Sequence, residues 1–175
     1  VKCFNKTGRL CVSDLHDGYT YESKGLYGEV VNKYDFEIMK ARMEKLIGLI
    51  EADYMTIVEY DNLVVAICGD VFENILRASS LTKLREPVID TVIKTSEFLC
   101  QWVAQLANTV GCDVRVVTVG GNHDTCSFLG ATPRFEDENL TKLVVEFMKL
   151  RFSGVPSIEI APFSDVAVQN ICGVN

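Results

Sequence analysis

The sequence is poor in histidine and proline, lacks long apolar runs and carries no excess of basic residues. It holds 2 histidines and 4 prolines in 175 residues. No apolar stretch approaches the roughly 18 residues of a membrane span, and the first residues lack the apolar core of a signal peptide. With 17 Lys and Arg against 24 Asp and Glu, the formal net charge is -7. These absences exclude a membrane-spanning protein and a protein that binds nucleic acid by charge alone.

Cysteine is present, but not in a pattern typical of disulfide or zinc scaffolds. The 7 cysteines form no Cys-x-x-Cys pair, and several lie inside apolar runs. Such thiols are typical of a reducing compartment, so we expect a cytoplasmic protein. The composition, 48% apolar and 23% charged, is ordinary for one compact domain, which at this length needs no structural metal to fold. We therefore expect residues 1–175 to form a single domain.

The hydrophobic pattern alternates between strand-like and helix-like segments. Buried strands are predicted over residues 9–13, 62–68, 114–119 and, more weakly, 157–160. Apolar residues recur at helical spacing over residues 36–50, 89–110 and 140–151. A strand followed by a helix, three times over, predicts an α/β fold with a layered, largely parallel β-sheet core flanked by helices. The tyrosine- and glycine-rich residues 18–33 are predicted to form a long loop.

Polar side chains follow three of the predicted strands at the point where each strand ends. Asp14 and His16 follow the first, Asp70 the second, and Asn122 and His123 the third, and these motifs contain both histidines of the chain. In an open α/β sheet this edge is where ligands bind. Side chains at i and i+2 of extended backbone point to one side, so the first pair is expected to converge on one ion. The mixed oxygen and nitrogen donors suit Mn²⁺, Fe²⁺ or Zn²⁺ rather than Ca²⁺.

Each of these residues has an ordinary structural explanation when it is taken alone. A single aspartate after a strand is more often a turn or helix cap than a ligand. The three motifs together reverse that judgement and favour a functional site. Glu73 and Asn74 stay open between orienting a metal-bound water and capping a helix. The aromatic and basic residues of segment 18–33 stay open between binding a nucleotide base and packing in a solvated loop.

Three short motifs carry a family resemblance. They are Ser13-Asp-Leu-His-Asp-Gly18, Gly69-Asp-Val-Phe-Glu-Asn74 and Gly121-Asn-His-Asp124. In this order they resemble the first three motifs of the calcineurin-like metallophosphoesterases, and the Gly-Asn-His-Asp motif is the most specific. The motifs span residues 9–126. The helix predicted near 138–152 and the strand after it resemble phage-encoded members that are similar to DNA-repair exonucleases.

The resemblance implies a site for two divalent metal ions. Asp14 and His16 would bind the first ion, Asp70 would bridge both, and Asn122 would bind the second. Two ions roughly 3.5–4 Å apart lower the pKa of a bridging water and clamp the phosphoryl oxygens. We expect Mn²⁺ first, with Fe²⁺, Zn²⁺ or Mg²⁺ as alternatives.

The resemblance also implies catalytic residues and a reaction. His123 would lie beside the phosphate as general acid or transition-state stabiliser, and Asp124 would hold its imidazole in orientation. The implied reaction is hydrolysis of a phosphoester by a metal-bridging hydroxide. We expect a nuclease-like phosphodiesterase acting on DNA or a nucleotide. Other phosphoesterases stay open, because substrate choice depends on loops rather than on the fold.

One departure from the family pattern stands out. The family carries a further histidine and then a Gly-His-x-His motif, whereas this sequence has no histidine after His123. Either the chain is an N-terminal portion of a longer enzyme, or it is a catalytically incomplete phosphoesterase-like binding scaffold. The second sheet of the family fold is then expected to be incomplete. Its open strand edges are expected to allow self-association.

Overall fold

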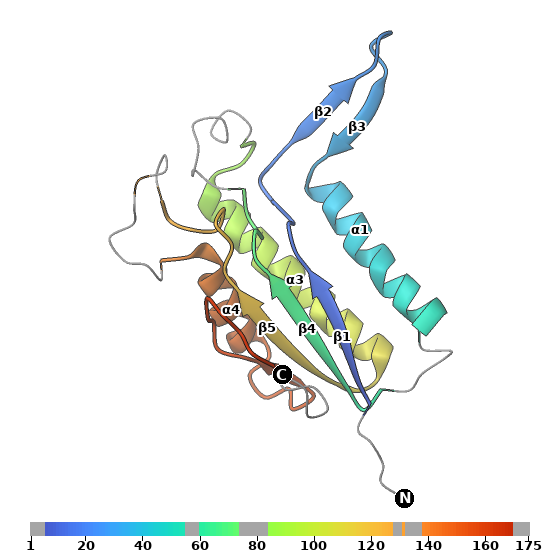
Figure 1. Cartoon of the computed structure of the whole chain (residues 1–175), viewed down its shortest axis with the longest axis vertical. Helices are drawn as coiled ribbons and strands as arrows, with labels where there is room; N and C mark the ends of the chain where they lie inside the picture. The colour runs from blue at the N-terminus through green and yellow to red at the C-terminus, as the bar shows by residue number, and fades with distance from the viewer. Residues whose placement is uncertain (1–5, 55–59, 74–83, 128–130, 132–137, 170–175) are drawn as a thin grey trace, which may run out of the picture.

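Four parallel strands form the central sheet. In spatial order they are β1 (Thr7–Val12), β4 (Asn62–Cys68), β5 (Asp113–Val119) and β6 (Ile158–Ile160). The computed structural model describes residues 6–54, 60–73, 84–127, 131 and 138–169 (Figure 1). Because the strands follow one another across the sheet in chain order, each crossover moves in the same direction.

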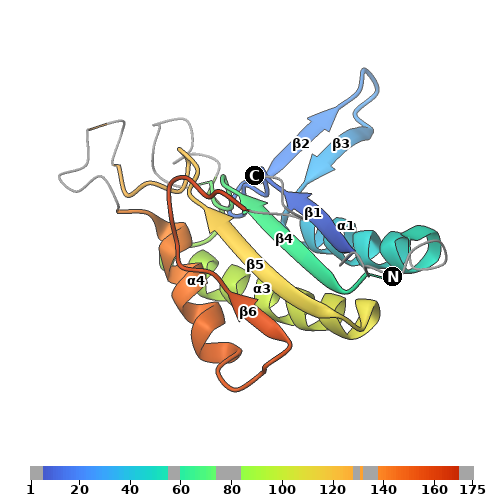
Figure 2. The same ribbon diagram turned by 60° about the horizontal axis from the view of Figure 1, so that its bottom comes forward.

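Three helices cover one face of this sheet. They are α1 (Phe36–Leu49), α3 (Val88–Val110) and α4 (Leu140–Arg151), and a short π-helical turn, η1 (Ile50–Tyr54), continues α1. Right-handed crossovers that all step in one direction place their helices on the same side, as Figure 2 shows. The predicted α/β class, with a layered parallel sheet flanked by helices, is confirmed.

The main hydrophobic core lies between the sheet and these helices. Val65 and Val116 contribute from the two central strands, and Leu99 and Trp102 contribute from α3, each at most 1% exposed. The indole nitrogen of Trp102 donates to the Met43 carbonyl at 2.8 Å, which fixes α3 against α1. On the opposite face of the sheet, a smaller buried cluster consists of Val64, Val117 and Ala161.

The segment predicted as a long loop instead contains an antiparallel hairpin, so that expectation is wrong. Its strands are β2 (Tyr21–Lys24) and β3 (Val30–Tyr34), which project from the body of the molecule (Figure 1). Leu26 and Tyr27 at the tip are 90% and 91% exposed. Neither face of the hairpin is buried, so its sequence lacks the apolar alternation by which half-buried strands are recognised. The remaining predicted helices and strands agree with the structure to within a few residues.

The long helices begin and end at recognisable signals. Asp35 caps the start of α1, because its Oδ1 accepts a hydrogen bond from the Ile38 backbone N–H at 3.0 Å. Gly111 ends α3 in the left-handed conformation, with φ of 66°. None of the described helices has the length and apolar character needed to cross a membrane. Asn74, one of the residues left open above, lies outside the described residues.

Candidate metal centre

The turns that follow β1 and β4 are joined to each other by backbone hydrogen bonds. Four such bonds, of 2.8 to 3.2 Å, connect residues 14–17 with residues 69–73 and continue the parallel pairing past the strand ends. Their effect is to hold the first two polar motifs side by side at the carboxyl edge of the sheet.

Three residues of these turns adopt a left-handed backbone conformation. Asp14, His16 and Asp70 have φ values of 56°, 45° and 50°. Positive φ is uncommon for non-glycine residues, and such conformations cost of order 1–3 kcal/mol each and cluster at functional sites. The sequence expectation of extended backbone at Asp14 and His16 is therefore wrong. Their side chains converge through two left-handed turns rather than through strand alternation.

The third motif packs against the second through glycine. A Cβ on Gly69 would lie 2.8 Å from the Cα of Gly121, so the two turns approach backbone to backbone. The Asp70 Oδ1 accepts a hydrogen bond from the His123 backbone N–H at 2.9 Å. Asp70 is thereby fixed between the first and third motifs.

Asp14, His16 and Asp70 form one cluster of ligand atoms. One ligand atom from each lies within 4.8 Å of the others. The His16 Nε2 is 3.7 Å from the Asp14 Oδ1, and the Asp14 side chain is largely exposed. The cluster thus opens to solvent on the side of Asp14, where a substrate can approach.

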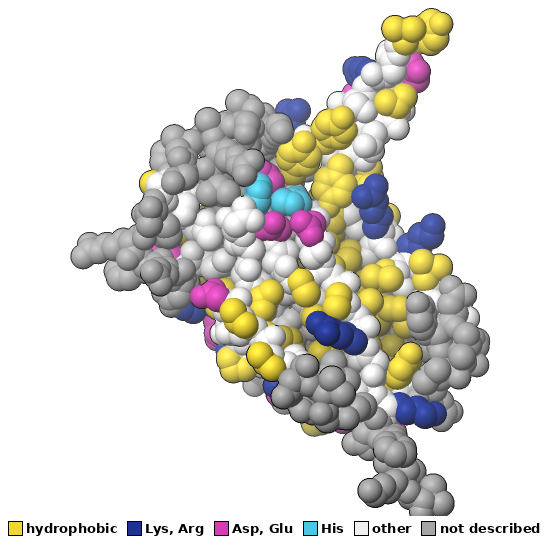
Figure 3. All heavy atoms as spheres, viewed as in Figure 1, with side chains coloured by type: hydrophobic (Ala, Val, Ile, Leu, Met, Phe, Trp, Pro, Cys, Tyr) yellow, Lys and Arg dark blue, Asp and Glu magenta, His cyan; other side chains and the backbone are white. Residues whose placement is uncertain are grey.

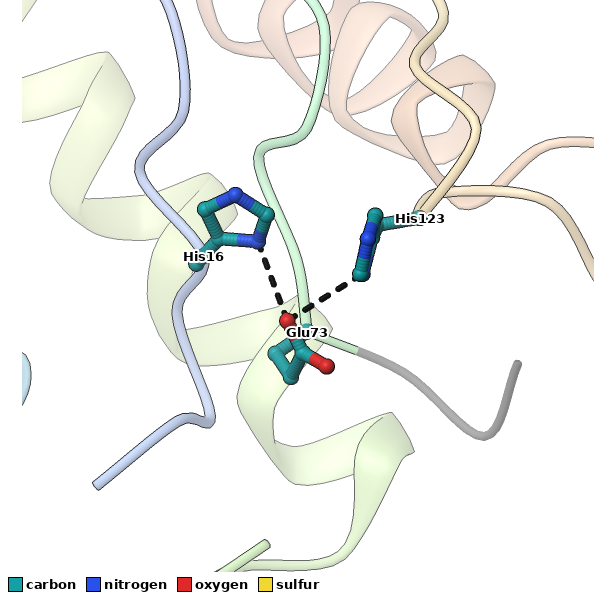
Figure 4. Close-up of side chains that lie close together, drawn as sticks. All are labelled: His16, Glu73 and His123. Carbon is teal, nitrogen blue, oxygen red and sulfur yellow. Dashed lines mark ion pairs between the residues drawn. The ribbon is translucent and has the colours of Figure 1, made fainter. Parts of the chain in front are cut away.

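A second cluster joins both histidines through Glu73. The Glu73 Oε2 lies 3.0 Å from the His16 Nδ1 and 3.1 Å from the His123 Nδ1 (Figure 4). The two imidazole rings meet edge to face, with centroids 4.8 Å apart. Despite these distances, neither Nδ1 has a hydrogen bond of acceptable geometry, although both atoms are buried. Glu73 is therefore a carboxylate placed next to the second ring nitrogen of both histidines, the position from which such groups orient an imidazole.

Asp124 is buried and is bonded to the backbone of two motifs. It is 0% exposed, and its two oxygens accept hydrogen bonds from the backbone N–H groups of Phe72 and Gly121, at 2.8 and 3.0 Å. Burial raises the pKa of this carboxyl, and its hydrogen bonds offset part of that rise. These contacts give Asp124 the task of joining the second and third turns. Its predicted orientation of the His123 imidazole stays a prediction, while Glu73 is a carboxylate that contacts that ring.

Asp17, in the first motif, is likewise a buried carboxylate that joins two segments of the chain. Its side chain is 2% exposed and accepts hydrogen bonds from the Gly18 backbone N–H and from the Thr95 hydroxyl on α3. Burial raises the pKa of its carboxyl, with the hydrogen bonds opposing that shift. The first turn is in this way anchored to the longest helix.

Asn122 lies at the start of the third turn with an exposed side chain. Its backbone carbonyl oxygen accepts a hydrogen bond from the Thr125 hydroxyl at 3.1 Å. The structure thus brings Asp14, His16 and Asp70 together, while Asn122 lies in the third turn, next in sequence to His123, whose backbone N–H is bonded to Asp70. Its role as a ligand stays a prediction.

The donor set fits divalent cations. Aspartate oxygens and imidazole nitrogens are ligands for Mn²⁺, Fe²⁺ and Zn²⁺, and ligating histidines commonly have a carboxylate at their second nitrogen, as His16 has in Glu73. Figure 3 shows the histidines and carboxylates gathered on one exposed patch of the surface. Without cations, three carboxylates at this patch would repel a phosphate.

The comparisons with known proteins agree with this geometry. No curated protein and no solved structure matches the sequence. The family of calcineurin-like phosphoesterases matches residues 9–170, which include all three strand-end motifs. On this match, the chain belongs to the calcineurin-like phosphoesterase family.

Proposed function

We propose that this metal-dependent phosphoester hydrolase carries a two-metal phosphodiesterase centre of nuclease type. The observation that supports it most directly is the cluster of Asp14, His16 and Asp70, all held in left-handed turns at one sheet edge. Asp14 and His16 would hold one divalent ion, Asp70 would be shared, and Asn122 would hold the second. Mn²⁺ is the ion we expect first, given the mixed donor set.

The residues of the chain divide the remaining work. Bound divalent ions would supply polarisation of the phosphoryl group and a water of lowered pKa. His123, beside His16, would donate a proton to the leaving oxygen or stabilise its developing charge. Glu73 would hold both imidazoles in orientation, because its Oε2 lies 3.0 Å from the Nδ1 of His16 and 3.1 Å from the Nδ1 of His123. Positioning of this kind contributes to catalysis by fixing groups before the reaction begins.

A nucleic-acid or nucleotide substrate is supported by the aromatic residues beside the first motif. Tyr19 and Tyr21 lie at the base of the hairpin with ring centroids 6.3 Å apart and planes 9° apart. Flat aromatic surfaces of this kind suit stacking with bases.

The amino-acid composition favours a second candidate function, that of a phosphoesterase-like scaffold that binds a partner without turnover. The observation that favours it is the sequence itself, which has 2 histidines, both already placed in the first and third motifs. A scaffold would fold as described and would hydrolyse nothing.

The first prediction tests the proposed centre directly. With Mn²⁺, we expect the protein to hydrolyse bis-p-nitrophenyl phosphate, and Asp70→Asn to lower kcat/KM at least ~100-fold. Even residues that only support a metal ligand are worth about 10- to 100-fold, so loss of a shared ligand should exceed that range.

The matched control is Asp113→Asn. It is the same chemical change, but at the first residue of β5, at the edge of the sheet opposite to the proposed centre. It should leave kcat/KM within about twofold. Full activity in Asp70→Asn contradicts the proposed centre, and absence of turnover in the unaltered protein means that these residues do not form a working centre by themselves.

A further inference from the structure

A groove beside the metal centre lies between the edge strand β1 and helix α1. It has a volume of about 610 Å³, within the range of small-molecule sites, and it is lined by residues 11–15, by Tyr34 and by α1 from Met39 onward. Asp14, a member of the ligand cluster, is also part of its wall. A molecule whose phosphate is bound at the centre can therefore extend into this groove.

One part of the groove is apolar. Met39 and Met43 are 2% and 5% exposed, Leu46 packs against the same core, and Leu49 is 44% exposed at the open side. The two methionines form the buried floor of the groove, and Leu46 and Leu49 offer the accessible apolar surface on which a flat ring can pack. The apolar part of a ligand would be shielded from water here.

The other part of the groove is basic. Arg42 and Lys45, spaced i and i+3 on α1, are both exposed and line the groove. Neither forms an ion pair within the described residues, although the chain has a net charge of -7. Two adjacent cations without acidic partners favour binding of an anion.

Unlike Arg42 and Lys45, the lysines of the hairpin and the neighbouring lysine of α1 each lie close to a carboxylate. Lys24 lies 3.5 Å from Glu22, Lys33 lies 2.6 Å from Asp35, and Lys40 lies 3.9 Å from Glu44. Their charges are balanced by carboxylates. Within the part of the chain that the structure describes, the two cations of the groove thus lack the carboxylate partners that these lysines have.

Arg42 is also held in place. Its guanidinium lies 5.5 Å from the centroid of the Tyr34 ring, and the Tyr34 hydroxyl donates to the carbonyl of Leu15, within the first motif. Burial raises the pKa of Tyr34 to about 12, so the hydroxyl keeps its proton at neutral pH. One side chain thereby ties the cation of the groove to the turn that carries Asp14 and His16.

We propose that this groove binds the unpaired nucleotide that flanks the scissile phosphodiester, and that Arg42 and Lys45 contact its next phosphate. The inference rests on the proposed function and specifies its substrate as single-stranded nucleic acid. A base within a duplex presents only its edges, whereas an unpaired base exposes a face that can pack on Leu46 and Leu49. A simple phosphomonoester would leave both the apolar wall and the two cations unused.

Binding of a fluorescein-labelled thymidine pentanucleotide with hydrolysis-resistant phosphorothioate linkages, measured by fluorescence anisotropy in the presence of Mn²⁺, tests the proposal without turnover. The double variant Arg42→Gln/Lys45→Gln should weaken binding at least ~5-fold. The slope of log K against log salt should fall by about 0.7, because both cations contact one phosphate and each contacted phosphate of a single strand contributes roughly 0.7. Arg42→Lys, which keeps the charge, should retain most of the slope.

The matched control is Lys40→Gln on the same helix, which removes a paired lysine that does not line the groove and should change neither affinity nor slope. An unchanged slope in the double variant, a duplex that binds as tightly as the single strand, or no binding by the unaltered protein overturns the proposal. Hydrolysis of bis-p-nitrophenyl phosphate, which has no second phosphate, reports on the metal centre separately. A protein that binds the oligonucleotide through the groove but hydrolyses no ester retains this inference and loses the proposed function.

Discussion

At the scale of single residues, the candidate centre depends on backbone conformations and contacts that few side chains tolerate. Asp14, His16 and Asp70 have positive φ, and their turns close against Gly121 of the third motif. A Cβ at position 121 would overlap both the backbone nitrogen and the Oδ1 of Asp70. Glycine is required at position 121 because Asp70, in the second turn, occupies the space of a side chain.

Replacing this glycine is the sharpest test at that scale. Gly121→Ala should displace Asp70, lower kcat/KM at least ~10-fold and reduce the free energy of unfolding by about 1–3 kcal/mol, the usual effect of forcing extra atoms into packed structure. Urea denaturation and the bis-p-nitrophenyl phosphate assay measure the two effects.

Gly48→Ala is the matched control, since a Cβ at Gly48 in α1 meets nothing within 4 Å. It should leave activity unchanged and add about 0.5–1 kcal/mol of stability, because alanine is the better helix former. Equal behaviour of the two alanine variants would contradict the close packing described for Gly121.

At the scale of elements, α1 contributes one wall of the groove and part of the hydrophobic core. Its first turn is capped by Asp35. The Asp35 carboxylate accepts from the Ile38 N–H and pairs with Lys33 of β3 at 2.6 Å. The Lys33 hydrogen bond, followed by that from Ile38, lowers the pKa of Asp35 below its usual 3.8. Strand β3 and helix α1 are thus joined at one charged residue.

Because this pKa is lowered on folding, Asp35 stabilises the folded state above its usual pKa and loses that contribution as the pH falls through the folded value. Asp35→Ala should reduce the free energy of unfolding by about 1 kcal/mol at pH 7, the usual effect of losing a helix cap. Urea denaturation from pH 7 to pH 3 should show the difference from the unaltered protein shrinking at the acid end. Asp35→Asn, which keeps the cap acceptor, should lose less, and a difference independent of pH contradicts the assigned cause.

The elements themselves were largely predictable, whereas their side-chain partners were not. The apolar residues of Asn62–Cys68 and Val88–Val110 form long and regular patterns, so the hydrophobic pattern alone predicts the strand and the helix. The hairpin was missed because Val30 and Val31 are 53% and 62% exposed and their burial pattern does not alternate. The role of Glu73 does not follow from the sequence, because its contacts reach from the second motif to both others and spacing along one segment does not reveal them.

At the scale of the whole molecule, three separate segments of the sequence meet at one edge of the sheet. Each arrives from a parallel strand, and the helices of the crossovers lie on one face of the sheet rather than at this edge (Figure 1). A ligand held by all three segments binds the folded chain and not the unfolded one. Metal binding and folding are for that reason expected to be coupled.

The coupling has a measurable size. At Mn²⁺ concentrations about 100-fold above the Kd, binding to the folded state alone adds about 2.7 kcal/mol to the free energy of unfolding. For a chain of this length, that corresponds to a rise in Tm of roughly 5–10 °C. Scanning calorimetry with Mn²⁺, with chelator and with Ca²⁺ should show the rise with Mn²⁺, its loss on chelation and a smaller effect of Ca²⁺, since imidazole donors suit it poorly.

Asp70→Asn separates a specific site from adventitious binding at the exposed carboxylates. If Asp70 is shared between ions, this variant should lose most of the rise in Tm, and titration calorimetry should show fewer than the two Mn²⁺ expected for the unaltered protein. A rise in Tm that survives in Asp70→Asn, or that Ca²⁺ reproduces in full, would mean that the metal binds elsewhere on an acidic surface and that the three turns do not form one centre.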